Sequence, residues 1–170
     1  MITLAQGTAT ATSVGQFVPA QMVKPISFWE GLQGQQLIRR FGLTTSGQML
    51  GEWLATAYPN LYGGGNGAPN LTPFTNAQIA SYYQSLFLVS KGTELDAEVL
   101  ATALEVFTTT ASLGSTVGQS FGYLVNAHGL GAYSWNVGTG GPAFGVSNFT
   151  ALNVFQILRD ANNSAVGGEP

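Results

Sequence analysis

The sequence predicts an α+β fold: a compact bundle of four to five helices with a C-terminal β-hairpin and an extended N-terminal β arm. Apolar residues recur at helical spacing in residues 27–58 and 75–107, whereas residue types alternate near both ends of the chain. A chain of 170 residues is long enough to bury one sizeable core. We therefore expect an arm over 1–25, a single globular domain over 26–162 and a polar tail over 163–170.

The N-terminal arm is predicted from alternating threonines and alanines followed by further apolar residues, with Pro19 and Pro25 as breaks. Threonine and valine favour a pleated surface. Edge strands normally carry charge or proline that blocks pairing, and residues 1–18 carry neither. The residues expected to mediate assembly are Thr8, Thr10, Thr12, Val14, Phe17 and Val18.

Two helices are expected in the first half of the domain. The first begins at an N-cap Ser27 and ends near Gly42, although internal glycines weaken it. The second runs from about Ser46 to Tyr58, where Pro59 ends it. Residues 60–74 are rich in glycine and proline and are expected to form a surface loop.

Two further helices follow this loop. Thr75 and Gln78 have the spacing of a capping box. The next helix, which Thr93 is expected to cap, has the clearest helical period in the chain. A link of about five residues predicts that the two helices pack antiparallel. The run of β-branched residues at 108–110 is expected to end the second of them.

The C-terminal third predicts a hairpin and one more helix. Residues 121–125 and 133–137 alternate in polarity around a turn-rich link, which is typical of two paired strands. A short helix over Leu152–Leu158 is expected after them, capped by Asn148 or Thr150.

Composition excludes several classes of function. Charged residues make up only 8% of the chain, against about 25% in ordinary soluble domains. Five basic residues cannot form the positive stripe that nucleic acid requires. Cysteine is absent, which excludes disulfides and thiolate chemistry. No apolar run approaches the length of a membrane span. The neutral, Thr/Gly/Asn-rich composition favours an extracellular or cell-surface location in a bacterium.

Two sets of residues could carry catalysis or bind metal. His128 is the only histidine, and a small hydrolase would have to use it, but no nucleophile elbow accompanies it. An exposed turn histidine is the simpler interpretation. The acidic cluster Glu94, Asp96, Glu98 and Glu105 suggests calcium, yet lacks the spacing of an EF-hand. Its first three members suit a helix N-terminus, so no cofactor is required.

Aromatic residues raise the possibility of carbohydrate stacking. Most of them fall at core spacing within the predicted helices, where burial is the ordinary outcome. Tyr62 and Trp135 lie outside those helices. They are therefore the two aromatic residues expected to be exposed and able to stack on a ligand.

Several short motifs resemble a module found in large secreted bacterial surface proteins, often beside immunoglobulin-like or SdrD-B-like repeats. The motifs are residues 26–29, 34–38, 53–54, 59–63, 76–80, 95–104, 136–138 and 143–146. The resemblance spans about residues 26–160 and implies a cell-surface or matrix protein with no assigned enzymatic activity.

These observations lead to a functional hypothesis. We expect a non-catalytic, extracellular structural protein whose partners are copies of itself. Its N-terminal arm either pairs with the C-terminal hairpin of its own chain or adds as a strand to a neighbouring subunit, which would build filaments. The alternative is a secreted carbohydrate-binding or adhesion module whose partners are glycans or other surface proteins.

Overall fold

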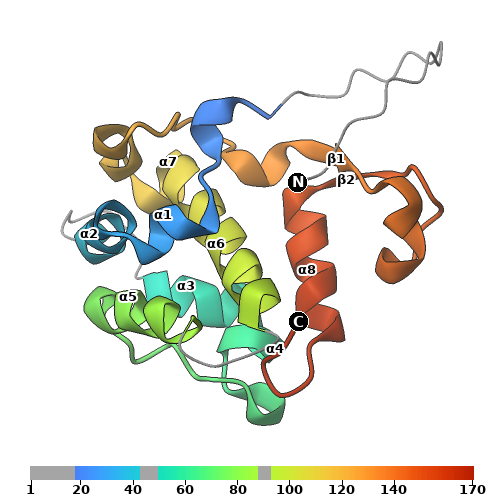
Figure 1. The fold of residues 1–170 in the computed structure, drawn as a ribbon, viewed down its shortest axis with the longest axis horizontal. Helices are drawn as coiled ribbons and strands as arrows, with labels where there is room; N and C mark the ends of the chain where they lie inside the picture. Colours follow the sequence, from blue (N-terminus) through green and yellow to red (C-terminus); the bar gives the residue numbers. More distant parts are fainter. Residues whose placement is uncertain (1–17, 43–49, 88–92) are drawn as a thin grey trace.

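The computed structural model describes residues 18–42, 50–87 and 93–170. These residues form mainly helices, with one small antiparallel sheet (Figure 1). The elements are η1 (Ala20–Met22), α1 (Ile26–Glu30), α2 (Leu32–Arg40), α3 (Leu50–Ala57), α4 (Pro59–Tyr62), η2 (Gly65–Gly67), α5 (Asn76–Ser85), α6 (Thr93–Thr109), α7 (Ala111–Gly114), η3 (Val117–Phe121), η4 (Leu130–Ala132), β1 (Ser134–Asn136), η5 (Gly138–Phe144), β2 (Ala151–Asn153) and α8 (Val154–Ser164), where η denotes a 3₁₀ helix.

The predicted class, helices with a small sheet, is confirmed at this coarse level. The predicted number of helices is too low, because the described residues contain eight α-helices, several of them only one or two turns long. None of the described helices combines the length and apolar character needed to cross a lipid bilayer.

Helix α6 is the centre of the core. It passes between α1 on one side and α8 on the other (Figure 1). Leu100, Leu104 and Phe107 project from it and are fully or almost fully buried. The Phe107 ring contacts the rings of Phe41 and Trp53, with centroid separations of 5.0 and 5.3 Å. The helix that the apolar spacing predicts here is therefore confirmed, and its central position is a finding of the structure.

The single helix expected after Ser27 is wrong, because the chain breaks at Gly31 into α1 and α2. Gly31 has extended backbone angles and serves as the C-cap of one helix and the N-cap of the next. The break lets α2 fold back on α1 at Gly34. A Cβ atom at Gly34 would lie only 2.3 Å from the Phe28 carbonyl oxygen, so this contact requires glycine.

The capping box at Thr75 is confirmed. The Thr75 hydroxyl accepts from the Gln78 amide, and the Gln78 side chain accepts from the Thr75 amide. The expected antiparallel pairing of α5 with α6 is not the main contact of α5, which packs chiefly on α2. Its apolar stripe (Ile79, Ala80 and Tyr83) is fully buried there, as a helix with a single apolar face requires.

The threonine run ends α6 as expected. The hydroxyls of Thr108, Thr109 and Thr110 each donate to the carbonyl four residues earlier, at 2.6 to 2.7 Å. These bonds satisfy the three hydroxyls inside the core, where an unpaired polar group would be costly. Thr110 then leaves the helix in an extended conformation and forms a bridge to Asn126.

The predicted hairpin between residues 121–125 and 133–137 is wrong in its pairing. The second segment does contain a strand, β1, but its partner is β2. The first segment instead follows η3, and the Leu124 amide donates to the Gln21 carbonyl. The segment does alternate between buried and more exposed residues, since Tyr123 is buried. It lies against the segment around Gln21 and not in a β-ribbon.

Two other boundaries also differ from expectation. The residue that caps α8 is Asn153, which forms a capping box with Gln156, rather than Asn148 or Thr150. The arm is not extended as far as residue 25, because residues 20–22 form the η1 turn and Met22 is fully buried. Residues 1–17 of the arm lie outside the described residues.

Candidate functional site

The β1–β2 ribbon is the sheet that the described residues form. The strands pair antiparallel, with Trp135 opposite Leu152. Further bonds extend the ladder at both ends: the amides of Val154, Val137 and Phe149 donate to the carbonyls of Tyr133, Thr150 and Gly138, respectively. The ribbon therefore runs over residues 133–138 and 149–154, and lies beyond the N-terminal end of α8 (Figure 1).

The outer edge of β1 carries backbone groups that find no partner among residues 18–42, 50–87 and 93–170. Because hydrogen-bonded and non-hydrogen-bonded pairs alternate in an antiparallel ladder, the N–H and C=O groups of Ser134 and Asn136 face away from β2. Within the described residues, no third strand pairs with this ribbon. The outer edge of β2 is less open, since the Asn153 amide donates to the Gln156 side chain.

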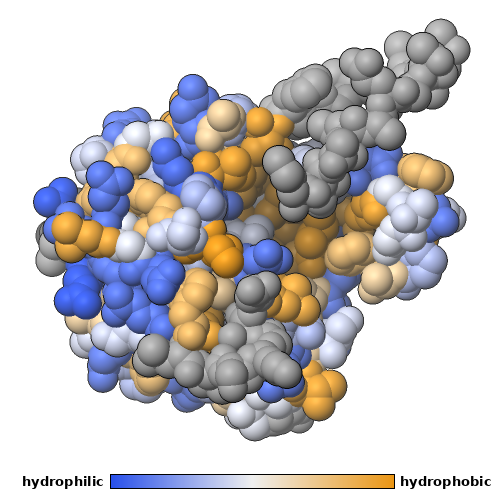
Figure 2. Space-filling view, in the orientation of Figure 1, coloured by the Kyte–Doolittle hydropathy of each residue, from blue (hydrophilic) through white to orange (hydrophobic). Residues whose placement is uncertain are grey.

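Exposed apolar groups accompany this edge. The Trp135 side chain is 55% exposed and pairs with Leu152, which is buried. Phe149, at the other end of the ladder, is also largely exposed. Figure 2 shows that apolar surface gathers in a recess between the helical body and the lobe that carries the ribbon. The ribbon thus combines open hydrogen-bonding groups with apolar surface.

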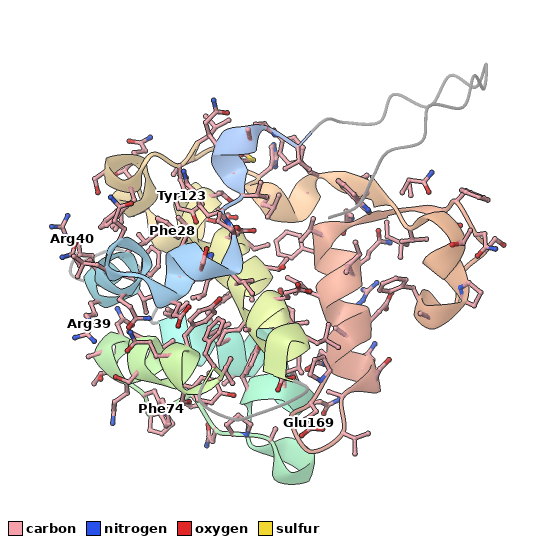
Figure 3. All side chains as sticks on the ribbon, in the orientation of Figure 1. Phe28, Arg39, Arg40, Phe74, Tyr123 and Glu169 are labelled. Atoms are coloured by element: carbon pink, nitrogen blue, oxygen red, sulfur yellow. The ribbon has the colours of Figure 1, made fainter. Side chains whose placement is uncertain are left out.

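The base of the N-terminal arm is fixed to the body. Val18 is half-buried and packs against the core, and Met22 is fully buried. The Gln21 carbonyl accepts from the Leu124 amide at 3.0 Å. The Lys24 ammonium lies 5.6 Å from the centre of the Tyr123 ring and 5.9 Å from that of Phe28. Figure 3 labels these two aromatic residues. The chain before residue 18 therefore starts from a defined point on the body.

A buried carboxylate lies under this base. Glu105 of α6 is 5% exposed and accepts from the Lys24 amide at 2.5 Å. Burial raises the pKa of Glu105 to about 8, and the Lys24 amide and the nearby Trp29 indole N–H oppose the rise only in part. The indole nitrogen makes no hydrogen bond of ordinary geometry within the described residues.

The acidic cluster does not come together as one group. Glu98 is exposed and Asp96 is half-buried, whereas Glu105 faces the core. Burial raises the pKa of Asp96, and the nearby charge of Glu169 raises it further. The side chain of Glu94 lies outside what the structure describes. Over residues 18–42, 50–87 and 93–170, no group of three acidic or histidine residues could hold a metal ion, so the calcium hypothesis gains no ligand set.

His128 lies in an exposed turn, as the simpler interpretation expected. Its backbone amide and that of Gly129 both donate to the Asn126 side-chain oxygen, at 2.9 and 2.8 Å. This arrangement is an Asx turn, a local motif that needs no catalytic explanation. The hydrolase hypothesis therefore stays untested.

The two aromatic residues expected to be exposed differ in their exposure to solvent. Trp135 is exposed as predicted, but Tyr62 is only 3% exposed, so that expectation is corrected. Pro59 does not simply end α3. It starts the short helix α4, because proline suits the first position of a helix. This turn directs Tyr62 into the core, where its ring contacts Tyr58 edge-on.

Comparisons of the chain with family models, curated proteins and solved structures find no match. The resemblance to a module of bacterial surface proteins therefore stays a prediction. The ribbon edge and the fixed base of the arm are the two features of the described residues that bear on function.

Proposed function

We propose that this protein is a non-catalytic structural protein that self-associates at the cell surface or outside the cell. In this proposal, the N-terminal arm of one subunit adds as a strand to the outer edge of β1 in the next. The observation that carries it is the edge at Ser134 and Asn136, which pairs with no third strand in the part of the chain that the structure describes. Strand addition supplies backbone hydrogen bonds to such an edge.

The chemistry of the edge supports this proposal. Residues 133–137 and 149–154 contain neither a charged residue nor proline, the two usual protections of an edge strand. A two-stranded ribbon is marginally stable by itself, and a third strand would stabilise it. The alternating segment of the arm, residues 8–14, is long enough to cover the six-residue ladder, which spans about 20 Å.

The geometry of attachment supports assembly between subunits. The arm starts from the fixed base at residues 18–24, while the acceptor edge is a different surface of the same chain. A donor surface that fits a different acceptor surface makes a head-to-tail contact, and such contacts continue into filaments when the rotation does not close a ring. The scarcity of charge in the chain also reduces the cost of desolvating this contact.

Proline in the arm should prevent assembly. A variant with Thr10→Pro and Thr12→Pro loses two backbone donors of the alternating segment, so we expect it to remain monomeric where the native chain forms larger species. Analytical ultracentrifugation and negative-stain electron microscopy measure this difference. The control replaces the same residues with serine and should assemble like the native chain. Equal assembly of the proline variant and the native chain would contradict the proposal.

A carbohydrate-binding or adhesion module is the second candidate, and the exposure of Trp135 favours it. An exposed aromatic ring on a ribbon is a flat surface on which a sugar ring can stack. Strand addition uses the backbone edge of β1, whereas stacking uses the indole face, so Trp135→Ala separates the two functions. Loss of binding on a glycan array without loss of assembly would support this second function.

A further inference from the structure

A groove of about 460 Å³ lies between the end of α3 and the first turns of α8. It is separate from the β1 edge, and nothing in the proposed self-association uses it. One wall consists of aromatic and small side chains from α3 and the residue that follows it: Trp53, Ala57 and Tyr58. The opposite wall consists of residues from the start of α8: Asn153, Phe155, Gln156 and Arg159.

The aromatic side chains of the groove are held in place. Trp53 and Tyr58 meet edge to face with ring centroids 5.6 Å apart, and Trp53 also contacts Phe107 in the core. The Phe155 ring rests on Gly131, where a Cβ atom would lie 2.2 Å from the ring. Phe155 is nevertheless 41% exposed. The groove therefore offers a supported aromatic surface to a ligand.

The wall formed by α8 presents hydrogen-bond donors to the groove. In the capping box of α8, the Asn153 side-chain oxygen accepts from the Gln156 amide, and the Gln156 side-chain oxygen accepts from the Asn153 amide, at 2.8 and 2.9 Å. Each of these bonds uses one lone pair of an amide oxygen, and the Nδ2 and Nε2 groups of the same two side chains only donate. Arg159, three residues after Gln156, adds a guanidinium on the same face of the helix.

The charge of the groove is positive. Arg159 lines it, and the described lining contributes no carboxylate. The positive end of the α8 dipole lies at the same position, since Asn153 is the N-cap of this eleven-residue helix. A ligand that matches these groups must carry acceptors and negative charge at one end and an apolar, flat body at the other.

We propose that the groove between α3 and α8 binds a small organic carboxylate, with the carboxylate on Arg159 and the capping-box amides and the flat body on Phe155. Guanidinium and carboxylate form paired hydrogen bonds, which are stronger than those between neutral groups. The same chemistry is found in aromatic acids and in acidic sugars. The two ligand classes differ in the ring that would lie on Phe155, which is aromatic in the first and a sugar ring in the second.

Nuclear magnetic resonance titration of the ¹⁵N-labelled full chain tests this proposal with four probes. Phenylacetate and its neutral analogue phenylacetamide test the aromatic source, and glucuronate and glucose test the sugar source. We expect one carboxylate to shift the amide signals of Ala57, Phe155 and Gln156, with a Kd of about 1 to 10 mM for a ligand of this size. The matching neutral probe should bind at least about tenfold more weakly, as loss of a charge-assisted contact requires.

Arg159→Gln should weaken the binding of that carboxylate about tenfold, since it removes the only cation of the described lining. Arg159 is exposed, so the variant is expected to fold. The matched control is Arg39→Gln, which removes the same charge from α2 on the opposite side of the molecule (Figure 3) and should bind normally. Equal binding of charged and neutral probes, binding unchanged by Arg159→Gln, or no binding by any probe would overturn the proposal.

Discussion

Replacing Glu105 with glutamine is expected to raise the free energy of unfolding at pH 9 by up to about 5 kcal/mol. Burial raises the pKa of this carboxyl from 4.5 to about 8, so at pH 9 the native protein holds a charge inside its core. Each pKa unit corresponds to about 1.4 kcal/mol, which sets the size of the effect. Glutamine is neutral at every pH and retains an oxygen that can accept from the Lys24 amide.

The direction of the pH dependence follows from proton binding. Between pH 4.5 and 8 the native state holds the Glu105 proton and the unfolded state has lost it, so stability falls as the pH rises through this interval. Below pH 4.5 both states are protonated, and the difference between Glu105 and glutamine should become small. Urea unfolding at a series of pH values measures this curve.

The control for this experiment is Glu98→Gln. Glu98 belongs to the same helix but is exposed, so its replacement should leave the alkaline loss of stability in place. A native chain that is equally stable at pH 5 and pH 9, with no gain from Glu105→Gln, would show that Glu105 is not buried beneath the base of the arm.

The second large effect is expected from Phe107→Ala. The Phe107 ring is 1% exposed and contacts both Phe41 and Trp53, so its removal leaves a cavity at the centre of the core. Buried phenylalanine truncations cost about 3 to 5 kcal/mol. A typical domain has a free energy of unfolding of about 5 to 15 kcal/mol, so this loss would remove about 20 to 100% of it.

Phe149→Ala serves as the control for this truncation. Phe149 is 66% exposed, so its replacement should change stability by about 0.5 kcal/mol or less, as for most surface positions. Denaturant unfolding monitored by circular dichroism measures both variants. Similar losses in the two would contradict the placement of Phe107 at the centre of the core.

The sequence predicted those elements whose signals are local. The α6 stripe and the Thr75 capping box depend on spacing within one helix, and both are confirmed. The partner of β1 could not be predicted, because pairing depends on long-range contacts. Residues 121–125 alternate as a strand would, but the bond from the Leu124 amide to Gln21 decides their position.

The candidate site could be predicted only in part. The exposure of Trp135 followed from its place outside the helical stripes, but Tyr62 was missed because Pro59 starts a helix instead of ending one. The burial of Glu105 had a signal in the sequence. It follows Ala101 by four residues and precedes Thr109 by four, a spacing that puts all three on the face of α6 that the structure buries.

The capping-box amides of the groove also carried a local signal. Asn153 and Gln156 have the spacing of a capping box immediately before an apolar stripe. The position of Arg159 on the same helix face followed from the spacing too. The opposite wall did not, because Trp53 and Tyr58 come from a distant segment that only the folded chain brings close.

The most direct test of the proposed assembly uses the absence of cysteine from the chain. One chain carries Thr10→Cys in the arm, and a second, isotope-labelled chain carries Ser134→Cys at the edge of β1. The two are mixed and oxidised, and mass spectrometry reads the pairing. Cysteines on adjacent strands lie close enough for a disulfide when their Cβ atoms are about 4 Å apart. Thr8→Cys and Thr12→Cys scan the register.

Strand addition between subunits predicts a disulfide that joins a labelled chain to an unlabelled one. In the comparison experiment, one chain carries both cysteines and is oxidised at high dilution. A disulfide within that chain would report pairing of the arm with its own ribbon. Assembly by strand addition therefore requires the mixed disulfide in the first experiment. A disulfide formed only inside the doubly substituted chain, with none between chains at any of the three arm positions, would contradict it.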